Sequence, residues 1–141
     1  MKRILLVEDS EDLKLVLVDE IERWFPSEIV TASSANEALK VLKTDRRFDL
    51  VITDFCMPNG TGKDLFEMMN ANQIEIPTLL FSSGVFGSYM QEDFDSCKQY
   101  GNFVDFIEKP DFKKLKAKAE SVFADNWRED KKNLPKHFDR S

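Results

Sequence analysis

Residues 50–58 read Leu-Val-Ile-Thr-Asp-Phe-Cys-Met-Pro, and Asn-Gly-Thr-Gly follows at residues 59–62. The stretch is a short apolar run that ends in one acid, Asp54, before proline and glycine break the chain. Apolar runs of this length that are rich in β-branched residues and closed by turn residues are typical of buried parallel strands. A carboxylate at the carboxyl end of such a strand lies where open α/β sheets bind their ligands. Aspartate is also common at turns and helix caps, so the stretch by itself leaves both interpretations open.

The rest of the chain alternates between similar apolar runs and amphipathic helical segments. Strands alternating with helices favour a parallel sheet that is covered by helices on both faces. Right-handed crossovers then place the carboxyl ends of all strands at one edge of the sheet. We therefore expect a doubly wound α/β fold, although composition does not fix the order of the strands. The expected strands are 2–7, 28–32, 49–53, 76–81 and 103–107, and the expected helices follow Ser10 and Ser34 and cover 62–70, 88–100 and 111–123.

Two local signals refine the helix ends. Ser34 and Glu37 have the Ser-x-x-Glu spacing of a capping box, which predicts that a helix begins there. Trp127 follows the last predicted helix, and we expect it to extend that helix before a solvated tail of mixed charge.

The composition excludes several classes of protein. The chain has 141 residues, which is typical of one domain with a real core. A net charge of −6 disfavours binding of nucleic acid by the domain as a whole. The apolar run behind Lys2 and Arg3 is too short for a signal peptide, and no run approaches the roughly 18–20 residues of a membrane span. We expect a cytoplasmic protein, in which Cys56 and Cys97 are reduced.

Charged side chains follow the predicted strands. Glu8 and Asp9 follow the first strand and Asp54 the third, while Ser82 and Lys109 follow the fourth and the fifth. In a doubly wound sheet of order 2-1-3-4-5, the first and third strands are neighbours, so the three carboxylates would crowd together. Their repulsion would raise a pKa unless a cation joined them, and oxygen-only ligands favour Mg²⁺. Three carboxylates, one Mg²⁺ and Lys109 sum to zero charge, so the pocket could accept a phosphoryl group.

These residues resemble the receiver domain of two-component response regulators, over about residues 1–125. Each motif alone is common, but all of them in order at the right strand ends are specific. The resemblance implies a stand-alone receiver with the flavodoxin-like strand order 2-1-3-4-5, followed at 126–141 by a helix extension or tail and no effector domain. The motifs are Val7-Glu8-Asp9, Asp54-x-x-Met57-Pro58 with Gly62, Ser82, and Lys109-Pro110.

The resemblance also implies a role for each residue of the site. Asp54 is the expected phosphoacceptor, which takes a phosphoryl group from the phosphohistidine of a partner kinase. Asp9, Asp54 and the backbone carbonyl of Cys56 are expected to bind Mg²⁺, with Glu8 acting directly or through a water molecule. Lys109 is expected to pair with a phosphoryl oxygen, because positioning and charge neutralisation dominate this chemistry.

Two further residues match the positions of a switch in this family. Ser82 matches the hydroxyl that moves toward the phosphoryl group, although Ser83 beside it is a second candidate. Phe106 matches the aromatic residue that rotates inward, where tyrosine is frequent; a plain core phenylalanine is the alternative. The Lys109-Pro110 bond is usually cis in the family, which would direct the lysine into the pocket.

The implied partners are a sensor histidine kinase or a histidine phosphotransfer protein, and a protein target on the face formed by 88–100, 103–107 and 111–123. Direct contact with nucleic acid or membrane is not expected. Two alternatives remain: a phosphorelay shuttle that passes its phosphoryl group to a histidine phosphotransfer protein, and a module cut from a longer regulator or hybrid kinase.

An enzymatic function fits these residues less well than a receiver domain does. A phosphatase with Asp54 as its nucleophile generally needs a second acid where Cys56 stands. A nucleotide-binding fold needs a phosphate loop where Glu8 and Asp9 stand. We expect a signalling switch rather than an enzyme of many turnovers.

Departures from the family pattern predict the lifetime of the phosphorylated state. Thr61 stands where many receivers have aspartate, whereas Cys56 and Gly84 stand where side chains flank the phosphoryl group. Glycine leaves the path of an attacking water molecule open, so we expect that dephosphorylation is not strongly hindered. The loss of phosphoryl group after removal of a phosphodonor measures this, and a lifetime of many hours would contradict it.

Overall fold

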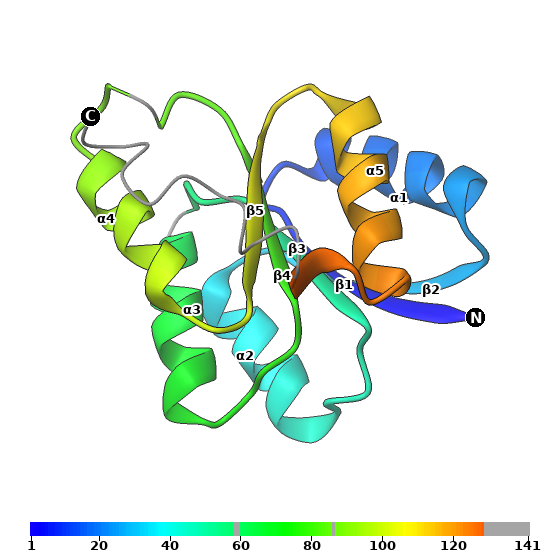
Figure 1. The fold of residues 1–141 in the computed structure, drawn as a ribbon, viewed down its shortest axis with the longest axis horizontal. Coiled ribbons are helices and arrows are strands. Elements are labelled where there is room, and N and C mark those ends of the chain that lie inside the picture. Colours follow the sequence, from blue (N-terminus) through cyan, green and yellow to red (C-terminus); the bar gives the residue numbers. More distant parts are fainter. Residues whose placement is uncertain (58–59, 86, 129–141) are drawn as a thin grey trace.

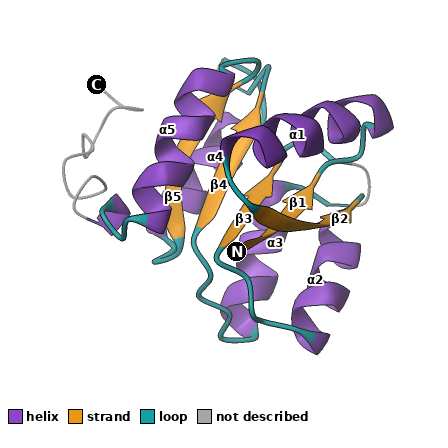
Figure 2. Ribbon diagram, turned by 90° about the vertical axis from the view of Figure 1, so that its right-hand side faces the viewer, coloured by secondary structure: helices purple, strands orange, loops and turns teal. Residues whose placement is uncertain are grey.

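The computed structural model of the chain describes residues 1–57, 60–85 and 87–128. Within these ranges, a five-stranded sheet is flanked by helices on both faces (Figures 1 and 2). The elements in chain order are β1 (Lys2–Val7), α1 (Glu11–Trp24), β2 (Ser27–Ala32), α2 (Ala35–Thr44), β3 (Leu50–Thr53), α3 (Gly62–Ala71), β4 (Thr78–Ser82), α4 (Gln91–Ser96), the 3₁₀-helix η1 (Cys97–Gln99), β5 (Phe103–Glu108) and α5 (Phe112–Phe123).

The sheet has the order β2-β1-β3-β4-β5, and every neighbouring pair is parallel. This confirms the doubly wound fold and its predicted strand order. In the register, Val7 at the end of β1 lies beside both Ala32 and Thr53. The residues that follow β1 and β3 are therefore neighbours at one edge.

The central strands supply side chains to both faces of the sheet, because successive residues of a strand point in opposite directions. In β1, Ile4 and Leu6 join the core cluster beneath α1 and α5, whereas Leu5 and Val7 join the cluster beneath α2 and α3. All four side chains are fully buried. This explains why β1 is a continuous apolar run rather than an alternating one.

A third cluster, which we call the phenylalanine cluster, lies beneath α3 and α4. Its buried members are Phe55, Phe66, Leu80, Val85, Phe94, Cys97 and Phe103. Phe94 is the buried residue of α4, and its ring meets that of Phe55 edge-on at 5.9 Å between centroids.

None of the helices in the described ranges is long and apolar enough to cross a membrane.

Side-chain caps determine where several helices begin. The Ser10 hydroxyl accepts a hydrogen bond from the backbone N–H of Leu13 at the start of α1. Ser34 accepts from the N–H of Glu37 in the same way, which is one half of the predicted capping box. A box with both bonds is formed instead at α3, by Thr61 and Asp64.

The fourth helix is shorter than the sequence indicates. The prediction was 88–100, whereas α4 begins at Gln91 and passes into η1. The chain before it forms a turn in which the Gly87 N–H donates to the Gln91 side chain at 2.7 Å and the Ser88 hydroxyl donates to the Val85 carbonyl at 2.6 Å. These local hydrogen bonds compete with the backbone hydrogen bonds of a helix, so the helix begins later in the sequence.

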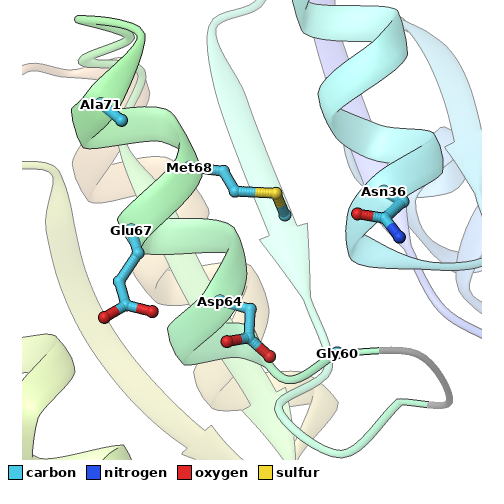
Figure 3. Close-up of a pocket in the computed structure, with 6 residues that line it drawn as sticks. All are labelled: Asn36, Gly60, Asp64, Glu67, Met68 and Ala71. Atoms are coloured by element: carbon cyan, nitrogen blue, oxygen red, sulfur yellow. The ribbon is translucent and has the colours of Figure 1, made fainter.

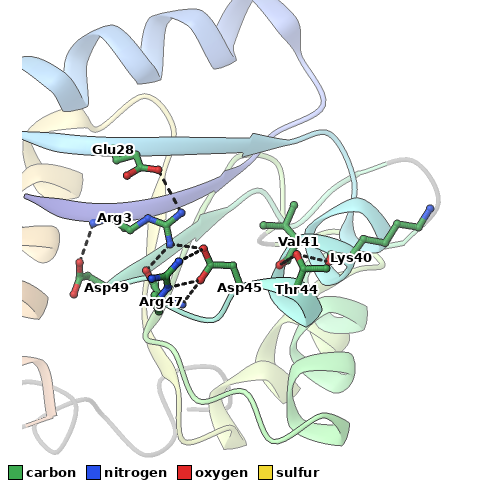
Figure 4. Close-up of polar contacts among 8 residues, drawn as sticks. All are labelled: Arg3, Glu28, Lys40, Val41, Thr44, Asp45, Arg47 and Asp49. Carbon is green, nitrogen blue, oxygen red and sulfur yellow. Dashed lines mark hydrogen bonds and ion pairs between the residues drawn. The ribbon is translucent and has the colours of Figure 1, made fainter.

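Arg3 fastens β1 to the segment that leads into β3 (Figure 4). Its guanidinium donates to Asp45 at 2.9 Å and to the Arg47 carbonyl at 2.8 Å, and it lies 4.5 Å from the centre of the Phe48 ring. Its backbone N–H donates to Asp49 at 2.8 Å. Hydrogen bonds from Arg47 lower the pKa of Asp45 to about 2, so this carboxylate stays charged well into the acid range. The start of β3 is therefore held in register with β1.

The chain turns after α5 instead of continuing it. The helix ends at Phe123, and Asp125 has a positive φ of 61°, while the Asn126 N–H donates to the Ser121 carbonyl at 2.9 Å. This turn brings Trp127 back onto the core beneath α5, where it is 2% exposed. The expectation that Trp127 extends the last helix therefore differs from the structure. Pro58 of the predicted turn and the tail at 129–141 lie outside the described residues.

Trp127 is expected to contribute strongly to stability. Truncation of a buried tryptophan leaves a cavity, so Trp127→Ala should lower the free energy of unfolding by about 3–5 kcal/mol, as measured by urea denaturation. The matched control is Arg128→Ala. The guanidinium of Arg128 lies 4.2 Å from the Trp127 ring on the exposed side, and its loss should cost about 1 kcal/mol or less. Equal losses in the two variants would contradict the packing role.

Candidate functional site

The predicted site residues meet at the carboxyl edge of the sheet. Glu8 and Asp9 follow β1, and Asp54 follows β3. Ser82 is the last residue of β4, and Lys109 follows β5. Glu8, Asp54 and Ser82 are almost fully buried, whereas Asp9 is exposed.

Both oxygens of Asp54 have hydrogen-bond partners. The Lys109 ammonium donates to Oδ2 at 2.7 Å. The Ser82 hydroxyl donates to Oδ1 at 2.5 Å, and the backbone N–H of Cys56 donates to the same oxygen at 3.1 Å. The carboxylate is thus fixed in orientation by three donors from three different segments.

Lys109 also joins Asp54 to Glu8, to which its ammonium donates at 3.0 Å. Burial raises the pKa of Glu8, and the hydrogen bonds from Ser10 and Lys109 only partly oppose this. Burial alone would lower the pKa of Lys109. The hydrogen bonds and charges of Asp54 and Glu8 outweigh burial, so the pKa of Lys109 is raised. The lysine therefore stays charged between the two carboxylates.

The acids form a possible cation site. Glu8, Asp9 and Asp54 each offer a carboxylate oxygen, and these oxygens lie within 4.8 Å of one another. One positive charge, on Lys109, lies among these three carboxylates. Oxygen donors with residual negative charge suit a hard divalent cation such as Mg²⁺. The side chains present therefore fit the predicted metal.

The other predicted residues lie near this centre. The Lys109-Pro110 peptide bond is cis, as the resemblance implies. Phe106 lies on β5 beside Leu80 of β4, half-buried, with its ring 4.7 Å from that of Phe94. Phe106 thus packs against the phenylalanine cluster.

Two glycines near the site differ in their surroundings and in their backbone conformation. A Cβ atom on Gly62 would lie 2.9 Å from the Leu80 side chain and 3.2 Å from the backbone of Phe55, so the turn after β3 has no room for a larger residue. Gly84 has φ +72° and open space around the position of a Cβ atom.

Two contacts around the site were not anticipated from the sequence. The first is the capping box of α3, which Thr61 and Asp64 form. Their Thr-x-x-Asp spacing resembles the capping pattern and could have indicated it. The Cys56 thiol donates to the sulfur of Met90 at 3.6 Å. No sequence signal connects these two residues, which lie 34 positions apart.

A hollow of about 350 Å³ between α2 and α3 lies outside the Asp54 site (Figure 3). Its lining includes Asn36, Gly60, Glu67 and Met68, together with Asp64. Asp64 is already engaged by the Thr61 backbone at 2.7 Å in the capping box. None of the predicted site residues lines this hollow, which is therefore not an extension of the carboxylate site.

Fold and site together define a doubly wound α/β domain with an acidic, lysine-paired centre at the carboxyl edge of its sheet. The family model described as the response regulator receiver domain matches residues 4–120 of this chain. The chain belongs to this family, which confirms the resemblance.

Relatives are found in several organisms. The chain is 37% identical over 82 residues to the two-component response regulator ORR3 of rice, Oryza sativa, a match that covers 57% of this chain and 62% of the rice protein. It is 30% identical over 127 residues to the 3′,5′-cyclic-nucleotide phosphodiesterase regA of Dictyostelium discoideum, covering 87% of this chain and 16% of that protein. The chain thus spans less than two thirds of the length of these relatives.

Solved receiver structures have the same fold. The receiver domain of HemR from Leptospira biflexa has a TM-score of 0.70 at 30% identity, covering 88% of this chain and 95% of that one. The response regulator TrrA from Thermotoga maritima, in complex with Mg²⁺ and BeF, has a TM-score of 0.71 at 28% identity, covering 86% and 99%.

The two cysteines should differ in reactivity. Cys97 is fully buried, and burial raises its pKa to about 12, so its reactive thiolate is scarce at pH 8. Burial raises the pKa of Cys56 as well, but its side chain is only half-buried. We expect iodoacetamide to label Cys56 first in the folded protein and both cysteines at similar rates in urea. Peptide mass analysis distinguishes them, and faster labelling of Cys97 in the folded protein would contradict this.

Proposed function

We propose that this chain is a phosphoacceptor switch, in which Asp54 accepts a phosphoryl group from a phosphohistidine and thereby changes a protein-interaction face. The observation that carries the proposal is the environment of Asp54. Its buried carboxylate lies 2.7 Å from the Lys109 ammonium, beside two further acids. Membership of the receiver family supports the same role.

The proposed reaction forms one bond and breaks one. A carboxylate oxygen of Asp54 attacks the phosphorus, the phosphorus–nitrogen bond breaks, and the electron pair stays with the imidazole of the donor histidine. Lys109 is placed to pair with the charge of the phosphoryl oxygens. Ser82 and the Cys56 N–H, which donate to Oδ1 at rest, are near enough to donate to those oxygens instead.

Mg²⁺ is the proposed cofactor. Glu8, Asp9 and Asp54 would hold it, together with the backbone carbonyl of Cys56. When bound there, the ion supplies positive charge to the phosphoryl oxygens. The complex of TrrA with Mg²⁺ and BeF supports this choice of metal.

Ser82 and Phe106 are the proposed switch residues. Ser82 would leave Oδ1 for the phosphoryl group, and Phe106 on the neighbouring strand would turn inward behind it. Phenylalanine lacks the hydroxyl of tyrosine, so the proposed rotation would depend on apolar packing alone.

The proposed partners follow from the family and from the relatives' names. A sensor histidine kinase or a histidine phosphotransfer protein would supply the phosphoryl group. A protein target would bind the face of α4, β5 and α5, without direct contact with nucleic acid or membrane. We place this activity in the cytoplasm and regard the chain as a switch rather than an enzyme of many turnovers.

The extent and pathway of the protein are part of the proposal. We assign residues 1–125 to the receiver domain and 126–141 to an extension that follows it. A phosphorelay shuttle is the second candidate, and fast reversible exchange with a histidine phosphotransfer protein would favour it. The position of the stop codon in the gene tests whether the chain is a module of a longer regulator.

The central test uses acetyl phosphate and Mg²⁺ with intact-mass analysis. We expect the wild type to gain one phosphoryl group, and chelation of Mg²⁺ should abolish the gain. Asp54→Ala should gain none, because the nucleophile is absent. Asp12→Ala, which removes an exposed acid from α1, should gain as much as the wild type. An undiminished gain in Asp54→Ala would refute the site assignment.

A further inference from the structure

A pair of sulfur atoms joins the loop after β3 to the start of α4. The Cys56 thiol donates to the Met90 thioether at 3.6 Å, and both side chains are half-buried against the phenylalanine cluster. Met90 is the residue immediately before α4. The contact therefore links the segment that carries Asp54 to a helix from a distant part of the chain.

On one side of this pair, Cys56 is bound to the phosphoacceptor itself. Its backbone N–H and the Ser82 hydroxyl share the same oxygen, Oδ1 of Asp54. A phosphoryl group on Oδ1 would take the space of both donors, so the Cys56 N–H would then have to change its partner. A phosphoryl group on Asp54 would therefore act on Cys56 directly, without an intermediate residue.

On the other side, the first turn of α4 is weakly fixed. Met90 is the N-cap residue of α4, and its side chain makes no capping hydrogen bond. Its backbone N–H donates to the Ser88 hydroxyl at 3.1 Å, in a turn that follows Gly84 and Gly87, both with positive φ. Because the side-chain cap is missing, the position of this turn depends on the local hydrogen bonds of Ser88 and Gln91 and on side-chain packing, to which the contact with Cys56 contributes.

We infer that the Cys56–Met90 contact couples occupancy of Asp54 to the first turn of α4, and that Met90 is a positioning residue for this site. The inference rests on the proposed function, because the occupant is a phosphoryl group. The path runs through the loop after β3, whereas the proposed switch runs through β4 and β5. It gives this chain a second connection between its site and its interaction face.

The test uses BeF with Mg²⁺ as the phosphoryl mimic on the full chain, with amide NMR shifts of Gln91–Ser96 as the readout. We expect the mimic to shift these signals in the wild type and the response to fall by half or more in Met90→Ala. The affinity for the mimic should fall about 5-fold, the lower end of ordinary allosteric coupling. Met90→Leu, which keeps the apolar contact with Cys56, should restore the response.

The matched control is Met68→Ala. Met68 is a half-buried methionine on α3 that packs against a different core cluster. Its loss should leave the α4 response unchanged, although it lowers stability by a similar mechanism. Equal effects of Met68→Ala and Met90→Ala would overturn the coupling role, because they would point to general destabilisation.

A double-mutant cycle isolates the contact. Cys56→Ala removes the thiol but keeps the backbone N–H that donates to Asp54. If the contact carries the coupling, Cys56→Ala combined with Met90→Ala should reduce the α4 response no further than either change alone. Reductions that simply add would overturn the inference.

Asp54→Asn separates the inference from the function on which it rests. If the wild type and Asp54→Asn respond alike to the mimic, or neither responds, both the proposed function and the inference fail. If the response needs Asp54 but Met90→Ala retains the full α4 shifts, the proposed function stands and only the inference fails.

Discussion

The ion pairs of Lys109 with Asp54 and Glu8 are the interaction on which the arrangement depends. A carboxylate that is 8% exposed and another that is 2% exposed are costly to bury without an opposite charge. Lys109 supplies that charge from a position 101 residues beyond Glu8 and 55 beyond Asp54. The ends of β1, β3 and β5 are thereby joined in one electrostatic unit. The parallel register makes this possible, because it brings every strand end to the same edge.

The core clusters on the two faces of the sheet differ in their distance from the Asp54 site. Beneath α1 and α5, one continuous cluster includes Ile4, Leu6 and Trp127, and the chain beyond α5 closes it. Beneath α3 and α4, the phenylalanine cluster reaches up to the Asp54 loop through Phe55 and Cys56. The first cluster contains residues of β1 and Trp127, whereas the second borders the Asp54 site directly.

The sequence predicts most of this architecture because the signals are local. β3 and Asp54 follow from one apolar run and its turn, whereas the strand order comes only from the resemblance to the receiver family. The start of α4 was misplaced because Gln91 and Ser88 bind the preceding turn, which depends on backbone geometry. The fold-back of Trp127 relies on Asp125 with positive φ, where no glycine signals a turn. The Cys56–Met90 contact arises only from tertiary packing. The meeting of Glu8, Asp54, Ser82 and Lys109 was anticipated, while their chemical roles stay predictions.

The shortness of α4 has a consequence for the energetics of the domain. A helix of six residues has few internal hydrogen bonds and is not stable alone in water. Its contacts with the rest of the domain include the Phe94 ring, which meets the rings of Phe55 and Phe106 at 5.9 and 4.7 Å, and the ion pair of Asp93 with Lys63 at 3.4 Å. Local displacement of a short element generally costs less free energy than global unfolding, because fewer contacts are lost. A ligand that binds one position of this helix better than another would redistribute the populations by its difference in binding energy.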